Sequence, residues 1–110
     1  MATLTVQEPT LAGITPTYAA VTAGGDEFAY SGGDILIHVK NSGTQQVVTV
    51  VTPATIEGVA IDNPTVTIPA TTGDKMIKLT APGNLFVPAD GKIDLTYDGA
   101  GGMTIAVFKV

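Results

Sequence analysis

The stretch "DILIHVKNSGTQQVVTVV", residues 34–51, decides the fold of this chain. Read with a period of two, its first half has the pattern of a half-buried strand, with one aliphatic face and one mixed face. The aliphatic face holds Ile35, Ile37 and Val39, and the mixed face holds Leu36, His38 and Lys40. The "NSG" that follows is typical of a turn, because Asn and Gly tolerate positive φ and Ser bonds its own backbone. The sequence therefore predicts a β-hairpin that continues into "TQQVVTVV".

Further strand signals follow at short intervals and are separated by turns rich in Gly, Pro, Asn and Asp. The expected strands are Ile35–Lys40, Gln46–Thr52, Thr65–Ile68, Lys75–Thr80, Lys92–Tyr97 and Met103–Val110. Several of them have one apolar and one polar face, which suits an antiparallel sandwich. The segments "VVTVV" and "TIAVFKV" are apolar on both faces. We expect such strands to be central or to be covered, for example by another subunit.

Length and composition favour one all-β domain. The chain has 110 residues, of which 45% are hydrophobic and 14% charged, so a packed core is expected. Its 13 glycines and 7 prolines suit short strands with tight turns, and no amphipathic helical window is present. We predict a β-sandwich of jelly-roll type over residues 34–110. Residues 1–33, broken by Gly and Pro, are predicted to form an irregular N-terminal arm with edge segments.

The charges argue against nucleic acid as a partner. The net charge is −5, and all five basic residues are lysines, so the bidentate arginine fork is missing. There is no cysteine, and stability is therefore expected to come from packing alone. No apolar run reaches the length of a membrane span, and "MATLTVQEPT" does not resemble a secretory signal, so we expect no membrane partner.

Few residues are candidates for chemistry. The strand neighbours of the single histidine, His38, supply no carboxylate, so we interpret His38 as a structural or solvent-exposed residue and expect no metal site. Ser31 and Ser42 lie in glycine-rich turns and outside any nucleophile elbow. Asp94 and Asp98 are candidates for part of a calcium site, but the segment around them lacks the closely spaced acidic ligands of a calcium-binding loop. We expect no catalytic residues and no cofactor.

The order of several segments resembles a family of small tailed-phage proteins, the capsid decoration proteins, also called cement or head-stabilisation proteins. The similar pattern begins at "LAGITPTYAAVTAGGD", continues through "LIHVKNSG" and a Val/Thr-rich strand, and then through "VTIPATTGDKMIKL". It ends with "LFVPADGKIDLTYDG" and "MTIAVFKV", so it covers nearly the whole chain. Each segment alone has a sequence that is common in β-strands, and the order of the segments along the chain is the distinctive feature.

The resemblance implies a non-enzymatic structural protein of the virion. Such a protein is made in the host cytoplasm and binds the capsid exterior, where it bridges and stabilises neighbouring copies of the major capsid protein. It also implies a homo-oligomer, with a trimer favoured. We predict interface positions at apolar residues of the arm, the long connector and the doubly apolar strands: Leu4, Val6, Leu11, Ile14, Tyr18, Val48, Val50, Leu85, Phe86, Phe108 and Val110. The alternatives are a bacterial surface or adhesion module and a carbohydrate-binding domain.

Overall fold

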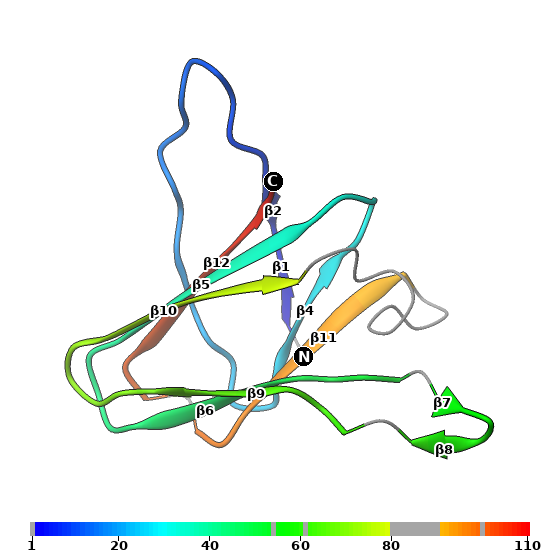
Figure 1. Cartoon of the computed structure of the whole chain (residues 1–110). Coiled ribbons are helices and arrows are strands. Elements are labelled where there is room, and N and C mark those ends of the chain that lie inside the picture. Colours follow the sequence, from blue (N-terminus) through cyan, green and yellow to red (C-terminus); the bar gives the residue numbers. More distant parts are fainter. Residues whose placement is uncertain (1, 54, 61, 80–90, 100) are drawn as a thin grey trace.

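The computed structural model describes residues 2–53, 55–60, 62–79, 91–99 and 101–110, which form strands and no helix (Figure 1). The strands are β1 (Ala2–Leu4), β2 (Val6–Gln7), β3 (Ala19–Ala20), β4 (Asp26–Ala29), β5 (Ile35–Asn41), β6 (Gln46–Val50), β7 (Thr55–Ile56), β8 (Val59–Ala60), β9 (Thr65–Ile68), β10 (Gly73–Leu79), β11 (Lys92–Tyr97) and β12 (Met103–Lys109). The expected all-β class is confirmed. The six expected strands correspond to β5, β6, β9, β10, β11 and β12, with ends that agree within two residues.

Most strands belong to two mixed sheets. The first sheet has the order β1-β4-β11-β6-β9. The second sheet has the order β10-β5-β12-β2, with β3 also paired to β12, and β7 and β8 form a separate hairpin. The predicted hairpin across residues 34–51 is wrong, because β5 and β6 belong to different sheets. The pairs among the six expected strands are antiparallel, whereas β1 runs parallel to β4 and β2 runs parallel to β12. Both parallel strands belong to the N-terminal segment, whose short apolar runs gave no signal for direction.

One hydrophobic core is shared by the two sheets, an arrangement consistent with a β-sandwich. The first sheet contributes Val48, Val50, Ile93 and Leu95 to it, and the second contributes Ile35, Ile37, Val39, Ile105 and Val107. Each of these side chains is at most 1% exposed. The alternation read from residues 35–39 is therefore confirmed, since its aliphatic face is the buried one.

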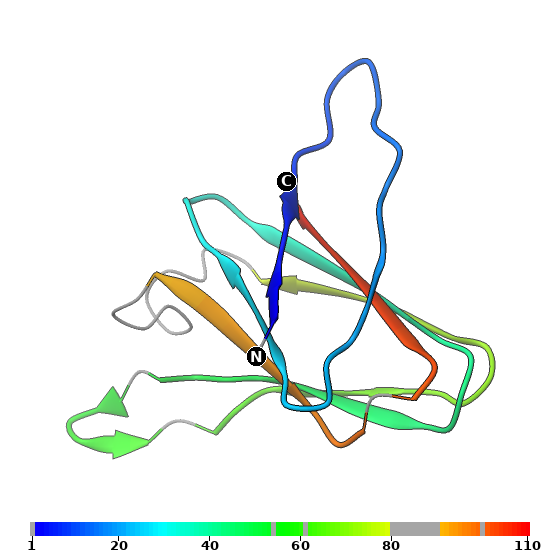
Figure 2. The ribbon, with the colours of Figure 1, turned by 180° about the vertical axis from the view of Figure 1, so that it is seen from behind.

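The N-terminal segment adds strands to both sheets. In the first sheet, β1 pairs with β4, and in the second, β2 and β3 pair with opposite ends of β12. Phe28 of β4 is fully buried in the core. Residues between β2 and β3 instead rise beyond the sheets as a loop (Figures 1 and 2). The division of the chain after residue 33 stays a prediction.

The outer face of β12 is covered within the chain itself. Ala106 and Phe108 pair with His38 and Leu36 of β5, so they point away from the core, yet Phe108 is only 7% exposed. No second subunit is needed to remove this phenyl ring from water, which accounts for the doubly apolar pattern of the last strand.

Candidate functional site

A loop of residues 8–17, the projecting loop, is closed at its base by one side chain. The Gln7 amide donates from Nε2 to the carbonyl of Thr17 at 2.8 Å and accepts the Thr17 N–H at Oε1 over 2.9 Å. One glutamine thus satisfies both backbone groups of a residue ten positions away, as a paired strand residue would. Pro9 and Pro16 stiffen the two arms of the loop, because each proline fixes its own φ.

The tip of the projecting loop is a tight turn with an apolar end. The Gly13 N–H donates to the Thr10 carbonyl at 2.9 Å, and Gly13 has a φ of 86°, which glycine adopts without strain. Leu11 occupies the turn and is 108% exposed, and Ile14 follows it on the surface. Single exposed leucines are common on proteins. Here the leucine stands at the end of a closed loop that extends away from both sheets (Figure 2).

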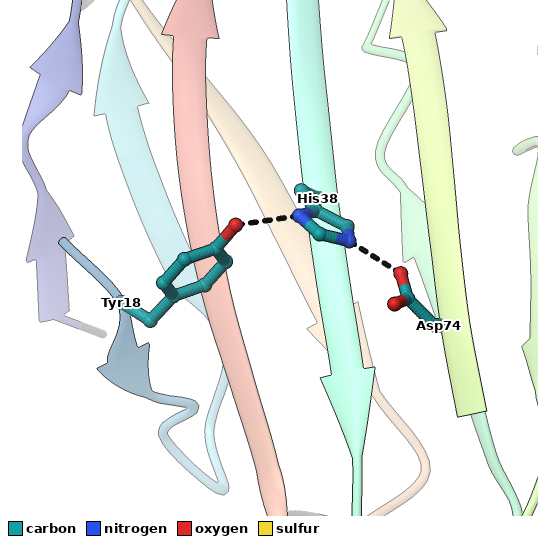
Figure 3. Close-up of polar contacts among 3 residues, drawn as sticks. All are labelled: Tyr18, His38 and Asp74. Atoms are coloured by element: carbon teal, nitrogen blue, oxygen red, sulfur yellow. Dashed lines mark hydrogen bonds and ion pairs between the residues drawn. The ribbon is translucent and has the colours of Figure 1, made fainter. Parts of the chain in front are cut away.

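A second cluster is formed by Tyr18, His38 and Asp74, which come from three separate segments (Figure 3). His38 lies in the middle of β5, Tyr18 comes directly before β3, and Asp74 belongs to β10. The Tyr18 hydroxyl is 2.6 Å from Nδ1 of His38, and Asp74 Oδ1 bonds Nε2. Lys40 Nζ sits 4.4 Å from the centre of the Tyr18 ring. An ionised Asp74 only accepts, so Nε2 carries a proton, and Nδ1 of a neutral ring accepts the Tyr18 proton.

The expectation of a histidine without a carboxylate partner is therefore wrong. The strand neighbours of His38 supply no acid, but β10 pairs with β5 so that Asp74 lies opposite Lys40, diagonal to His38. Cross-strand diagonals bring side chains within reach of each other. His38 is 8% exposed, and it joins Tyr18, which directly follows the projecting loop, to Asp74.

A buried carboxylate fixes the turn before β4. Asp26 is completely buried, and its Oδ2 accepts the Tyr97 hydroxyl at 2.7 Å and the Thr22 N–H at 3.1 Å. Burial, together with the bond to Asp26 and its charge, holds the pKa of the Tyr97 phenol well above its usual range. In the sequence, Asp26 follows Gly24 and Gly25 and carries no mark of this burial.

The expected interface residues fall into three groups. Leu11, Ile14 and Val110 are exposed, while Leu4, Val6 and Tyr18 are half-buried. Val48, Val50 and Phe108 are buried within the chain, the first two in the core. Leu85 and Phe86 lie outside the described residues. Of the expected positions, the projecting loop brings Leu11 and Ile14 together, with Tyr18 at its end. Their role in an interface stays a prediction.

Comparisons with family profiles, with curated proteins and with solved structures return no match for this chain. Within the described ranges, no group of three or more His, Cys, Asp or Glu side chains is placed to hold a metal ion. No helix long and apolar enough to cross a membrane occurs among these residues.

Proposed function

We propose that this protein is a structural component of a tailed-phage virion. In this proposal it binds the capsid exterior, bridges neighbouring major capsid subunits and stabilises the shell without catalysing a reaction. The order of segments along the chain, which resembles capsid decoration proteins, supports the proposal. So does the self-contained core, which leaves the projecting loop free to make contacts.

The observation that carries the proposal is the form of the projecting loop. Its base is closed by Gln7, its arms contain Pro9 and Pro16, and its end presents Leu11 to solvent. A preorganised loop loses little conformational entropy when it docks, and a single aliphatic anchor in a pocket contributes a large share of a small interface. Between Pro9 and Thr17 the loop carries no charge, so it suits an apolar recess at the junction of two capsid subunits.

The finer architecture belongs to the same proposal. Successive strands β4, β5 and β6 lie alternately in the first and second sheets, which supports a jelly-roll-like path for the chain. A trimer at capsid three-fold positions rests on the resemblance, and Val110 at the exposed C-terminus is a candidate contact.

Cosedimentation with empty shells tests this function. The proposal requires a major capsid protein encoded in the same genome as this chain, and the shells are assembled from that protein. We expect saturable binding of the full chain, and we expect Leu11→Asp to weaken it by at least about tenfold, because burying a carboxylate in an apolar recess is costly.

Val59→Asp is the matched control, since Val59 is also an exposed aliphatic residue, at 68%, but lies on the β7–β8 hairpin. Its binding is expected to equal that of the unmodified chain. Absence of the chain from the shell pellet would contradict the function. Equal binding by Leu11→Asp and the unmodified chain would contradict the role of the loop.

A further inference from the structure

A shallow, open depression lies where three turns meet at one end of the second sheet. It has a volume of about 300 Å³, and its polar lining comes from Lys40, Ser42, Thr71, Thr72, Asp74 and Thr104. Lys40, Asp74 and Thr104 lie side by side on adjacent strands, because Lys40 pairs with Asp74 on β10 and with Thr104 on β12. We call this hollow the turn-end depression. It is distinct from the projecting loop.

The floor of the turn-end depression is held rigidly. The buried Asn41 side chain donates to the carbonyls of Thr44 at 2.6 Å and Pro69 at 3.1 Å, which ties two turns together. The turns after β5 and before β12 touch so closely that a Cβ on Gly43 would lie 2.5 Å from the Gly101 carbonyl oxygen. Ser42 N–H also donates to the Gly102 carbonyl at 3.0 Å. Polar side chains on such a base keep their spacing when a ligand binds.

The two charged groups of the depression are positioned by neighbours outside it. Asp74 Oδ1 is held by His38 Nε2, while the Asp74 side chain remains 60% exposed, so its carboxylate is both oriented and open to solvent. Lys40 lies over the Tyr18 ring, a contact that attracts the ammonium group. One acid and one base give this site no net charge.

One residue of the lining is strained. Thr71 has a φ of 64°, in the left-handed region that a β-branched residue rarely adopts. Its N–H donates to the Gly43 carbonyl at 2.8 Å, and the next N–H, of Thr72, bonds the Ala70 carbonyl at 2.6 Å. These bonds hold two neighbouring hydroxyl side chains at the rim of the depression. Strain kept in a surface turn is a recognised mark of a functional position.

We propose that the turn-end depression binds a neutral polyhydroxylated ligand, a single sugar residue at the end of a glycan. The exposed carboxylate of Asp74 accepts hydrogen bonds from neighbouring hydroxyls, Lys40 donates to ring or hydroxyl oxygens, and the Ser and Thr hydroxyls do both. A purely apolar ligand would desolvate the Asp74 carboxylate and the hydroxyls without bonding them, whereas the C–H groups of a sugar can rest on the threonine methyls and the Lys40 stem. An anion would be repelled by Asp74 and by the net charge of −5. A cation would be repelled by Lys40.

Titration of the isotope-labelled full chain, followed by amide NMR shifts, tests the inference. The probes are the methyl glycosides of glucose, galactose, mannose and N-acetylglucosamine. At least one of them is expected to give saturable shifts, with a millimolar Kd, at the backbone amides of residues 40–42, 71–74 and 102–104. Asp74→Ala is expected to raise that Kd about tenfold or more, because one charged acceptor is lost.

Thr104→Val gives a second, independent variant, since it removes a hydroxyl while keeping a β-branched strand residue, and a severalfold rise in Kd is expected. Glu8→Ala removes an exposed carboxylate from the projecting loop and is expected to leave the Kd unchanged. Three results would overturn the inference: no saturable shift with any probe, shifts confined to other surfaces, or unchanged affinity in both site variants. The free protein is used, so a failure to bind shells has no bearing on this result.

Discussion

The His38 ring contacts Tyr18 on one side and Asp74 on the other, so its removal affects two segments at once. We expect His38→Gln to lower the free energy of unfolding by about 1–2 kcal/mol, since two hydrogen bonds are lost and both partners regain water only in part. Urea denaturation of the variant and of the unmodified chain measures this difference in unfolding free energy. Lys78→Gln, on the exposed face of β10, is the control and should change stability by less than about 0.5 kcal/mol. A His38→Gln variant as stable as the control would contradict the role given to the ring.

The buried Tyr97–Asp26 pair predicts a loss of stability in alkali. The pKa of Tyr97 is raised above its ordinary value of 10.0 in the folded chain, chiefly by burial and then by Asp26. The folded state therefore keeps a proton that the unfolded state loses. The stabilising contribution is complete below pH 10.0 and is lost as the pH rises above that value.

Tyr97→Phe isolates this effect. Above the ordinary tyrosine pKa we expect the unmodified chain to lose up to about 1.4 kcal/mol more per pH unit than the variant, measured by urea unfolding at several alkaline pH values. Below the ordinary tyrosine pKa, the unfolding free energies of the unmodified chain and of the variant should change with pH in parallel. Identical slopes in alkali for both proteins would show that Tyr97 ionises in the folded state as readily as in the unfolded state.

Among the elements, the projecting loop depends on Gln7 for its shape. We expect Gln7→Ala to leave the global unfolding free energy within about 1 kcal/mol of the unmodified value, because the lost bonds are exposed. Residues 8–17 should nevertheless become more susceptible to limited proteolysis. Glu8→Ala removes an exposed neighbouring side chain that takes no part in the Gln7–Thr17 bonds, so this variant should be cleaved like the unmodified chain. Equal cleavage of the Gln7 variant would mean that the clamp does not order the loop.

The turn before β10 needs glycine. A Cβ on Gly73 would lie 2.2 Å from the Pro69 carbonyl oxygen and 2.8 Å from Ile68 Cγ2, so the turn has to shift. We expect Gly73→Ala to cost about 3 kcal/mol by thermal or urea unfolding. Gly24→Ala is the matched control, because nothing lies within 4 Å of its added Cβ, and its cost should be below about 1 kcal/mol. Equal costs at the two positions would contradict this packing.

The strands with period-two alternation were predictable, and the pairings between them were not. The alternation in β5 identified Ile35, Ile37 and Val39 as core residues, because successive side chains of a strand point to opposite faces of the sheet and these three share one face. The short strand β4 was missed, since "DEFA" has two acids beside its single large apolar residue. Asp74 was not predicted as the partner of His38, because the register of β10 against β5 places it there. The register depends on which two strands pair and on the turn that joins them, and the sequence of β5 alone shows neither.

Across the whole molecule, the described surface carries two separate features: the projecting loop with its apolar tip, and the turn-end depression with its hydroxyl groups and its Lys40 and Asp74 charges. The loop extends beyond one end of the sheets, and its tip carries no charge. The depression lies among the turns of the second sheet, and its lining is rich in hydroxyls. Under the two proposals, the loop contacts capsid subunits and the depression, on another part of the surface, contacts sugars.

Cryo-electron microscopy of shells incubated with the full chain tests directly whether this protein decorates a capsid. The shells are assembled from the major capsid protein that the proposal requires in the same genome. We expect added density on the outer surface that fits the two sheets, with the projecting loop and Leu11 inserted where two capsid subunits meet. Shells without added density, or density in which the loop points away from the shell, would contradict it.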